Sequence, residues 1–381
     1  MNVTVVCDVL GSENNGTTIA AMNLIRALKD KGHHVNVVCP DTDRQGESGF
    51  YVTPKMHFGR FIDKYVEKNG VVIAKKDRNV LLQAMENADV VHVMMPFSLG
   101  KAAARIAKEK GIALTAGFHC QAENVTGHLF LQSFHLASRV AYRVFYRRLY
   151  RHCDRIHYPT QFIRDTFERV VGSTPGQVIS NGVGSRFKPL PAAPGREDRR
   201  YTLLFTGRYS PEKSHAVLIR ALAKSRHRDE IDLILAGSGP REKAIRRLAR
   251  RKGLKEPTMR FFSREEMLDV LARTDLYVHP AEIEIESIAC LEAIACGRVP
   301  LIADSPRSAS RYFALSEKNL FVYNDPGDLA AKIDWWLEHP EEKEKCAAQY
   351  AGYAEQFNFD RCMDEMERLL LGAAEAKKHV S

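Results

Sequence analysis

Short runs of apolar, mostly β-branched residues alternate along this chain with segments whose apolar positions recur every three or four residues. The runs predict buried strands, and the recurring positions predict helices. In the first half, the predicted strands are residues 3–7, 34–39, 90–94 and 112–116, with helices at 17–31, 80–87 and 99–110. This alternation predicts a parallel sheet that is covered by helices on both faces.

The pattern stops over residues 185–200, which are rich in proline and charge, and it resumes beyond them with strands at 201–206, 231–236, 259–262, 276–279 and 299–303. Such a break is typical of a linker. We therefore expect an α/β protein with two doubly wound, Rossmann-like domains that face each other across a cleft. The predicted parts are an N-terminal domain (1–184), a linker (185–200), a C-terminal domain (201–356) and a final helix (357–381) that packs back on the N-terminal domain.

Length and composition agree with two soluble domains. The 381 residues suit two domains of about 150–200 residues each, and no apolar run approaches the roughly 18 residues of a membrane-spanning helix. The N-terminus has no basic flank or cleavage site, and the eight cysteines form no C-x-x-C pair. We expect a cytosolic protein without a secretory signal, with reduced and mostly structural cysteines. The net charge of +9 favours an anionic partner: nucleic acid, a membrane surface or a phosphorylated substrate.

Ligands of open parallel sheets bind beyond the carboxyl ends of the strands, and several polar loops follow predicted strands. Gly207-Arg208 ends one strand, and Lys213 follows at the start of a helix. A glycine, two cations and a helix N-terminus together suit a phosphate, although a solvated basic loop has the same composition. Two glycine loops, at Gly237 and at Gly16, would let a backbone approach a phosphate, and ordinary turns explain them equally well.

Acidic residues cluster after the predicted strand 276–279. Glu282, Glu284 and Glu286 lie in the loop, and Glu292 lies two turns inside an apolar helix. A buried carboxylate needs a partner, which sugar hydroxyls or a structural arginine could provide. In the first half, His119 follows a predicted strand beside Gln, Glu and Asn, and it has either a structural or a functional role.

Taken in order, these segments resemble the retaining glycosyltransferases of family 4, which have the two-domain GT-B fold. The resemblance covers nearly the whole chain. Its motifs are the loop with Gly16, Gly32-His33, His119, Asn181-Gly182-Val183, Gly207-Arg208 with Lys213, Gly237-Ser238-Gly239-Pro240, and the pair Glu284 and Glu292 at E-x7-E spacing. Each motif is weak alone, and the ordered set is specific.

The resemblance implies a role for each matching residue. Arg208 and Lys213 would bind the donor diphosphate and stabilise the leaving group, while Glu284 would hold hydroxyls of the donor sugar near the anomeric carbon. Glu292 would hold the ribose hydroxyls of the nucleotide. His119 would contact the donor sugar from the N-terminal, acceptor-side domain. The donor-binding glycines would be Gly16 and Gly237. Basic groups and a helix dipole would neutralise the diphosphate, so we expect no metal site and no cofactor.

This chain departs from the family pattern at four positions. Glu286 and Ser287 replace an aromatic residue and a glycine, Gly184 replaces an aspartate, and Ser214 replaces a glycine. The wording of segments 118–124, 284–292 and 303–309 is similar to bacterial diacylglycerol α-glucosyltransferases. That similarity implies UDP-glucose as the donor and diacylglycerol as the acceptor.

A stretch without acids precedes Cys153 and carries arginines at four-residue spacing. With aromatic residues beside them, they predict an amphipathic helix for an anionic membrane surface, formed by Arg139, Arg143, Arg147, Arg148 and Arg151. A solvated helix that packs its apolar side on the domain is the alternative. A second basic cluster, residues 246–252, is interpreted as a plain exposed helix face.

The leading hypothesis is therefore a cytoplasmic enzyme, peripherally bound to the inner face of the membrane, that transfers glucose from UDP-glucose to a lipid such as diacylglycerol. The alternatives are the same chemistry on a soluble or cell-envelope sugar, an epimerase on the same scaffold, and a nucleic-acid-binding α/β protein. The last would use the charge but leaves the acid pair unexplained, so we expect no nucleic-acid partner. Donor, acceptor, number of sugars, oligomeric state and the roles of Glu282 and Glu286 stay open.

Overall fold

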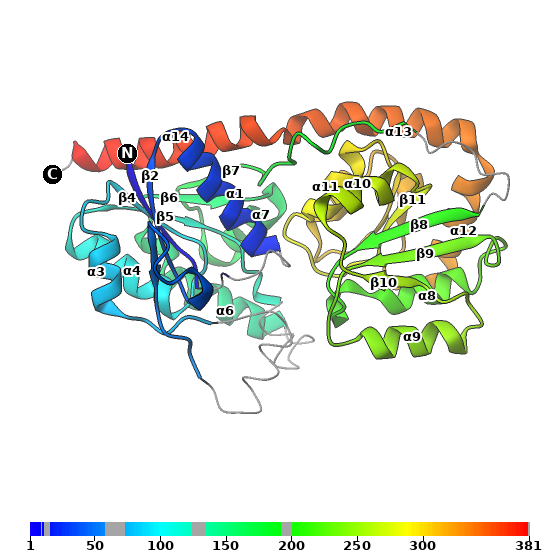
Figure 1. Cartoon of the computed structure of the whole chain (residues 1–381), viewed down its shortest axis with the longest axis horizontal. Helices are drawn as coiled ribbons and strands as arrows, with labels where there is room; N and C mark the ends of the chain where they lie inside the picture. The colour runs from blue at the N-terminus through cyan, green and yellow to red at the C-terminus, as the bar shows by residue number, and fades with distance from the viewer. Residues whose placement is uncertain (9, 11–15, 58–72, 124–134, 192–199, 380–381) are drawn as a thin grey trace. The chain divides into compact units, whose positions relative to one another are not determined.

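The computed structural model covers the whole chain and describes every residue except 9, 11–15, 58–72, 124–134, 192–199 and 380–381. The chain forms two compact units (Figure 1). Unit 1 consists of Met1–Asn181 together with Asp360–Ser381, and unit 2 consists of Gly182–Phe359. Each unit is built around its own parallel sheet.

The sheet of unit 1 has seven parallel strands in the order β3-β2-β1-β4-β5-β6-β7. The β-branched runs fill its centre: β1, β4 and β5 are buried along almost their whole length, as expected for strands covered on both faces. The strands are β1 (Asn2–Val6), β2 (His34–Cys39), β3 (Phe50–Val52), β4 (Val90–Val93), β5 (Ala113–Gly117), β6 (Arg155–Tyr158) and β7 (Gly176–Val178).

Helices of unit 1 connect successive strands. Gly32, at φ +80°, ends the first helix where the sequence places a glycine. The helices are α1 (Gly16–Asp30), α3 (Arg78–Ala84), α4 (Ser98–Glu109), α6 (His135–Arg148), α7 (Gln161–Val171) and α14 (Phe359–Lys378), with short 3-10 turns η1 (Thr42–Arg44) and η2 (Tyr150–His152).

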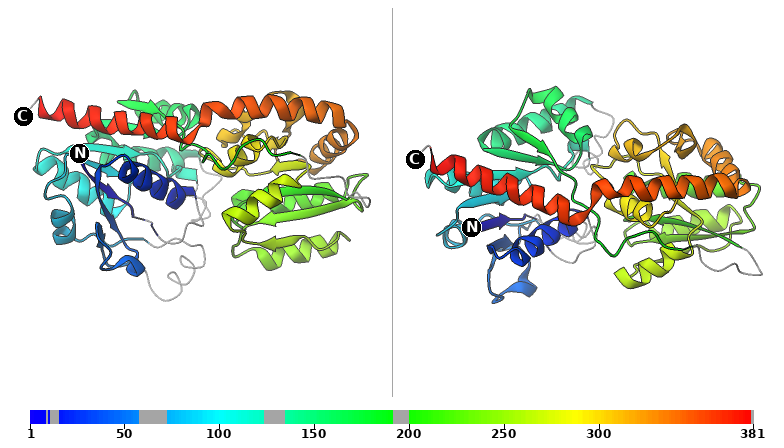
Figure 2. Two further views of the ribbon diagram at one scale, coloured as in Figure 1. Left: turned by 45° about the horizontal axis from the view of Figure 1, so that its top comes forward. Right: turned by 90° about the horizontal axis from the view of Figure 1, so that it is seen from above.

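The terminal helix α14 lies beside the turns that lead into β2, β4 and β6 (Figures 1 and 2). Glu367 accepts from His33 at 2.6 Å, just before β2. Lys378 pairs with Asp89 at 2.9 Å, just before β4. These contacts lie at the amino ends of the strands. Helix α14 therefore does not cover the carboxyl ends, where the loops with the polar motifs begin.

The sheet of unit 2 has six parallel strands in the order β10-β9-β8-β11-β12-β13. Its strands are β8 (Tyr201–Thr206), β9 (Ile231–Ala236), β10 (Thr258–Arg260), β11 (Leu276–His279), β12 (Pro300–Ala303) and β13 (Leu320–Phe321). Its helices are α8 (His215–Leu222), α9 (Glu242–Arg251), α10 (Arg264–Ala272), α11 (Ile288–Ala295), α12 (Pro326–Glu338) and α13 (Pro340–Ala354), with 3-10 turns η3 (Pro211–Lys213), η4 (Ala309–Phe313), η5 (Glu317–Asn319) and η6 (Glu355–Phe357).

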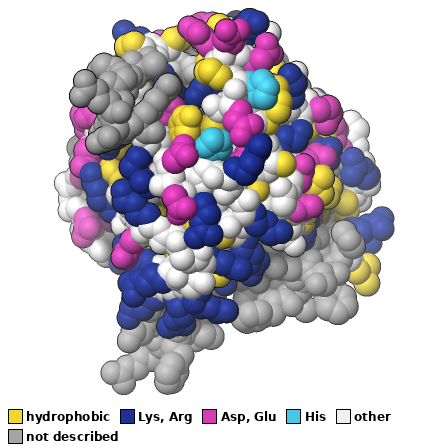
Figure 3. All heavy atoms as spheres, turned by 90° about the vertical axis from the view of Figure 1, so that its right-hand side faces the viewer, with side chains coloured by type: hydrophobic (Ala, Val, Ile, Leu, Met, Phe, Trp, Pro, Cys, Tyr) yellow, Lys and Arg dark blue, Asp and Glu magenta, His cyan; other side chains and the backbone are white. Residues whose placement is uncertain are grey.

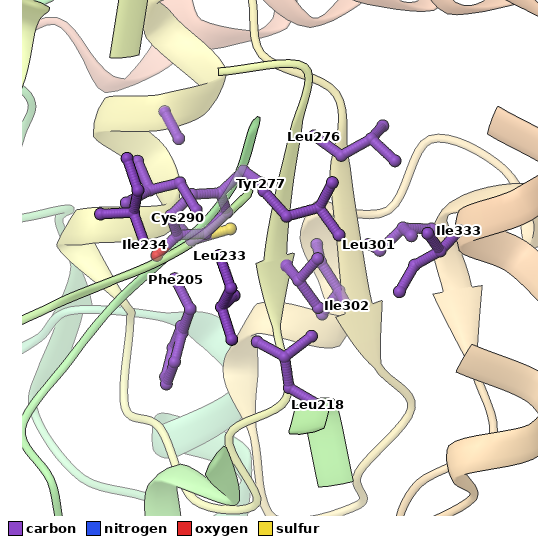
Figure 4. Close-up of a cluster of buried hydrophobic side chains, with 14 of the residues drawn as sticks. Phe205, Leu218, Leu233, Ile234, Leu276, Tyr277, Cys290, Leu301, Ile302 and Ile333 are labelled. Atoms are coloured by element: carbon purple, nitrogen blue, oxygen red, sulfur yellow. The ribbon is translucent and has the colours of Figure 1, made fainter. Parts of the chain in front are cut away.

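Apolar side chains from the strands and from α8, α11 and α12 form the core of unit 2 (Figure 4). Ile234 and Tyr277 share the face of the sheet on which Cys290 of α11 lies, whereas Phe205 and Leu233 point from the opposite face. All eight cysteines are buried and none is in a disulfide with a described residue, in agreement with the expected reduced state. This core fixes the strand ends whose loops carry the polar motifs.

The predicted fold class is confirmed: both halves are doubly wound, Rossmann-like parallel sheets. Strands β3, β6, β7 and β13 have only two to four residues, and they were not predicted from the apolar runs. Residues 192–199 of the predicted linker lie outside the described residues. Its first part belongs to unit 2, where Arg298 donates to Leu190 O at 2.5 Å and Leu190 N donates to Cys296 O at 3.3 Å.

Candidate functional site

Two glycine loops meet where β8 and β9 end in unit 2. Gly207 N donates to Ala236 O at 2.9 Å, and Tyr209 N donates to Ser238 O at 2.8 Å. A Cβ at Gly237, where φ is +153°, would lie 2.2 Å from Gly207 O. A Cβ at Gly239, where φ is +156°, would lie 2.7 Å from Tyr209 N. Both positions therefore require glycine, because φ is positive and the two backbones approach closely. This close packing holds the loop of Arg208 against the loop of Gly237.

The predicted cations lie on this loop and on the turn that follows it. Lys213 ends η3, and Ser214, at φ +50°, joins it to α8. Arg208 pairs with Glu212 at 3.3 Å, and Ser210 Oγ donates to the same carboxylate oxygen at 2.5 Å. Arg208 is therefore held by an acid of its own turn, while Lys213 reaches a different segment.

Lys213 Nζ contacts Glu284 Oε1, so the structure brings two predicted site residues together. Glu284 lies between β11 and α11, where its backbone pairs with Ser308 and its carbonyl accepts from Ala309 N at 2.9 Å. Burial would raise the pKa of this carboxyl, but Lys213 and His279 outweigh it and lower the pKa to about 2. Glu284 is therefore ionised throughout the physiological range.

Glu292 is in a contrasting environment on α11. Burial raises the pKa of its carboxyl to about 7, and Arg264 only partly opposes this. Among the described residues, no hydrogen bond or ion pair to its side chain is found, so an arginine acts on it there only through the electrostatic effect of Arg264. Tyr277 lies within electrostatic reach of both Glu284 and Glu292, which places the two acids around one ring.

The other two acids of the segment are placed differently. Glu282 forms an ion pair with Arg307, and its backbone N donates to Glu212 O at 2.8 Å. Glu286 is 4% exposed and therefore buried within unit 2. Glu282 thus ties its loop to the segment after β12, which is a structural role.

His119 lies in unit 1, directly after β5. Its ring packs edge-on against His157 with centroids 5.4 Å apart. Burial, followed by the nearby His157 and His92, holds the pKa of His119 well below its usual range, so the ring is neutral. Gly117 provides the space for it, because a Cβ there would lie 2.5 Å from His119 Nε2. Gly16, the first residue of α1, is also in unit 1, and residues 11–15 before it lie outside the described residues.

Helix α6 carries four of the five predicted arginines, and Arg151 lies in the turn η2 that follows it. Tyr142, Phe145 and the following Leu149 are buried, so the inner side packs on unit 1 as the alternative interpretation expected. Leu136 and Val140 are 69% and 50% exposed. The arginines beside them are exposed, and none pairs with an acid among the described residues: Arg139, Arg143, Arg147, Arg148 and Arg151.

The second basic cluster lies on α9 of unit 2. Figure 3 looks onto unit 2 and shows Lys and Arg side chains mixed with acids. Arg246 pairs with Glu242 and with Glu256, each at 2.9 Å, and Arg250 lies 3.7 Å from Glu256. Part of this cluster is therefore neutralised locally, unlike the face of α6.

The sequence did not single out His279 or Arg307. His279 is the last residue of β11, and its side chain is 1% exposed and lies 3.3 Å from Glu284 Oε1. A histidine at a strand end just before the acidic loop is the available signal, and it was taken as part of the strand. Within the described residues, no group of three or more His, Cys, Asp or Glu side chains could hold a metal ion.

No described helix is long and apolar enough to span a bilayer.

Solved structures with the same architecture include HepE from Anabaena in complex with UDP-glucose, which is 15% identical over 97% of this chain and 99% of that chain, with a TM-score of 0.75. WaaG, a glycosyltransferase involved in lipopolysaccharide biosynthesis, is 17% identical over 97% of this chain and 100% of that chain, with a TM-score of 0.70. At these identities the similarity shows the fold alone, which is the GT-B fold.

Curated relatives are similar in sequence as well. A GDP-mannose-dependent alpha-mannosyltransferase of Corynebacterium glutamicum is 28% identical over 374 residues, covering 92% of this chain and 84% of the relative. D-inositol 3-phosphate glycosyltransferase 2 of Catenulispora acidiphila is 29% identical over 209 residues, covering 49% of this chain and 48% of the relative. Both are named for sugar transfer.

Two family models match successive parts of the chain. Residues 14–186 match the model described as Glycosyltransferase Family 4, and residues 187–352 match the model described as Glycosyl transferases group 1. The two matches include every predicted donor-site residue, from Gly16 to Glu292. With its two parallel-sheet units and this match along nearly its whole length, the chain belongs to the family 4 glycosyltransferases.

Proposed function

We propose that this glycosyltransferase moves glucose from UDP-glucose to a membrane lipid such as diacylglycerol, with retention at the anomeric carbon. The observation that carries the proposal is the contact between Lys213 and Glu284 beside the loop of Arg208. These residues lie in loops at the carboxyl ends of the strands. The two cations suit a diphosphate, and the ionised carboxylate suits sugar hydroxyls.

In this mechanism, Arg208 and Lys213 bind the diphosphate and neutralise the charge that develops as the bond from sugar to phosphate breaks. Glu284 uses Oε1 for Lys213, so its second oxygen is available to accept a hydrogen bond from the donor sugar. Glu292 accepts from the ribose hydroxyls, and ionises as they bind, because these donors stabilise its charged form. His119, as a neutral imidazole, contacts the donor sugar, and the backbone at Gly16 and Gly237 lies near the phosphates. The proposal needs no metal or cofactor.

The lipid acceptor is supported by the outer face of α6. Exposed Leu136 and Val140, beside arginines that pair with no acid of the described residues, form a surface that suits an anionic bilayer: the apolar side chains enter the interface and the cations meet the headgroups. We accordingly propose peripheral attachment to the cytoplasmic face of the membrane. Nucleic acid has no role in this proposal.

GDP-mannose is a second candidate donor, because the curated relative that covers 92% of this chain is named as a GDP-mannose-dependent mannosyltransferase. The roles of Arg208, Lys213 and Glu284 would be unchanged, since they concern the diphosphate and the sugar hydroxyls. A soluble or cell-envelope sugar would then be the alternative acceptor.

Both donors can be tested in one assay. The full chain is incubated with UDP-glucose, UDP-galactose or GDP-mannose, each with and without vesicles that contain diacylglycerol, and nucleotide release and lipid products are measured. We expect UDP release and a glucosyl lipid only with UDP-glucose and diacylglycerol together. Mannosyl product from GDP-mannose, or no lipid product with any donor, would contradict the proposed donor or acceptor.

A further inference from the structure

His279, Glu284 and Ser287 meet between β11 and α11. His279 Nε2 lies 3.3 Å from Glu284 Oε1 and 3.1 Å from Ser287 Oγ. The imidazole is enclosed by aromatic neighbours, with Tyr277 stacked at 6.1 Å and Phe205 edge-on at 5.6 Å. This packing leaves the ring little freedom, so Nε2 is fixed between the carboxylate and the hydroxyl.

The neighbours of the His279 ring determine which of its two nitrogens carries the proton. Burial favours the neutral imidazole, which carries one N–H. Glu284 is ionised and can only accept, so the proton belongs on Nε2, and the buried Nδ1, which has no hydrogen-bond partner, is the bare nitrogen. His279 Nε2–H is then shared between Glu284 Oε1 and Ser287 Oγ, and it fixes both.

This assignment also orients the hydroxyl of Ser287. Its oxygen accepts from His279, so its own hydrogen is available for donation, and no acceptor for it is found among the described residues. Ser287 precedes α11, three residues after Glu284, whose second oxygen faces the sugar in the proposed mechanism. A hydroxyl donor and a carboxylate acceptor therefore lie side by side, and a sugar hydroxyl needs both.

The backbone of Ser287 adds a second observation. Its φ of +66° is left-handed, a conformation that suits glycine and strains other residues. Glycine is also what the family pattern has at this position, so serine here costs stability while adding only a hydroxyl.

We infer that Ser287 is a donor-specificity residue whose hydroxyl, oriented by His279, donates a hydrogen bond to a hydroxyl of the transferred sugar. The inference rests on the proposed function, because it requires a nucleotide sugar at Glu284. In this arrangement His279 is a positioning residue that does not touch the substrate.

The test compares sugar recognition with nucleotide recognition. Dissociation constants are measured for UDP and UDP-glucose, and for GDP and GDP-mannose, with the wild-type chain and with Ser287→Ala and Ser287→Gly. For the pair that the wild type binds, we expect the ratio of the nucleotide-sugar constant to the nucleotide constant to rise about tenfold in both variants, as loss of one hydrogen bond predicts. Binding of UDP or GDP alone should stay within about twofold.

A strain control separates the hydroxyl from the backbone. Ser287→Gly and Asn324→Gly both replace a left-handed non-glycine residue (φ +66° and +62°), so both should raise the melting temperature. Only the Ser287 variants should change the ratio of binding constants. For the positioning role, His279→Gln keeps an N–H donor and should retain most of the wild-type ratio, whereas His279→Leu should raise the ratio as Ser287→Ala does.

The possible failures are distinguishable. If the wild type binds UDP-glucose and both Ser287 variants keep the ratio within twofold, the inference is wrong and the proposed function stands. If it binds GDP-mannose instead and the ratio is kept, the inference and the proposed donor are both wrong. If the wild type binds neither nucleotide sugar, the proposed function is wrong and the inference falls with it. If His279→Leu keeps the wild-type ratio while Ser287→Ala does not, the hydroxyl acts without His279 and the positioning role is overturned.

Discussion

The two units differ in how they satisfy ionisable side chains near the carboxyl ends of their strands. In unit 1, Asp8 follows β1 and accepts from Leu99 N at 3.0 Å and Gly100 N at 3.1 Å, at the start of α4. Likewise, His157 bonds to Ile179 O at 2.7 Å. In unit 2, Glu284 is satisfied by side chains, those of Lys213 and His279. Asp8 and His157 of unit 1 thus bond to backbone groups, whereas Glu284 of unit 2 bonds to one charged side chain, Lys213, and one neutral side chain, His279.

The difference separates groups that hold the fold from groups that can exchange partners. Asp8 and Glu292 both have a pKa raised to about 7 by burial, so titration alone does not distinguish them. Asp8 is bound to backbone amides that cannot leave without unfolding α4. Glu292 has no hydrogen-bond partner among the described residues, and Lys213 can turn from Glu284 to a phosphate. Unit 2 is therefore the unit that can receive a ligand through these groups.

The largest expected effect comes from breaking the ion pair between Lys213 and Glu284. Glu284→Gln and Lys213→Ala should each lower turnover by about 10²–10³-fold, because each removes a charge aligned with the donor. Steady-state rates with the proposed donor and acceptor, together with circular dichroism to verify folding, provide the measurement.

The control in unit 1 is Asp8→Asn, which changes a buried carboxyl that accepts hydrogen bonds from backbone amides instead of side chains. It should lower the melting temperature and leave turnover per folded molecule within about threefold, because Asp8 bonds to the fold. Turnover that drops equally in Asp8→Asn and Glu284→Gln would end the distinction between the two units.

The next effect concerns the charges that unit 1 leaves unpaired on α6. Replacing Arg139, Arg143 and Arg147 by Gln should weaken binding to phosphatidylglycerol vesicles about 100-fold, at about 1 kcal/mol for each arginine. The same three changes on α9, at Arg247, Arg250 and Arg251, give a control of equal charge and should have a much smaller effect. Flotation measures both, and equal wild-type recovery with neutral and anionic vesicles would contradict membrane attachment.

The sequence could predict what depends on local pattern. The long apolar strands and the glycine loops follow from periodicity and position, whereas the E-x7-E pair follows from the resemblance to the family. The structure places Glu284 beside Lys213, 71 residues away in the chain. Short edge strands such as β13, with two residues, carry too little pattern to be found. His279 was missed because its contact with Glu284 depends on packing between Phe205 and Tyr277, which no local pattern records.

A smaller effect is the pH dependence of Glu292, whose pKa is about 7 in the folded protein. Ribose hydroxyls need the ionised carboxylate as acceptor, so donor affinity should be full above pH 7 and fall about tenfold between about pH 8 and about pH 6. Glu292→Gln should flatten this profile, whereas Asp8→Asn should not. A wild-type profile that is flat over this range would exclude Glu292 as the ribose ligand.

Asp8 and Glu292, whose pKa values are both raised by burial, are expected to affect the pH dependence of stability in the same way. A pKa raised above its unfolded value contributes stability that is present below about pH 4 and is lost as the pH rises through 7. Removing either carboxyl should therefore reduce the loss of stability between pH 4 and pH 7, which chemical denaturation at several pH values would measure. The pH profile of stability is expected to be the same for Asp8 and Glu292. Only the pH profile of donor affinity therefore distinguishes them.

The smallest effect tests the second strained serine of unit 2. Ser214, at φ +50°, joins Lys213 to α8 where the family pattern has glycine. Ser214→Gly should stabilise the protein by about 1 kcal/mol, which raises the melting temperature by about 2–4 °C for a unit of this size. Unlike Ser287, Ser214 has no side-chain hydrogen bond to the described residues, so its replacement should leave the ratio of UDP-glucose to UDP binding unchanged. A change in that ratio would mean that the conformation after Lys213, and not only the hydroxyl at 287, sets how the sugar is held.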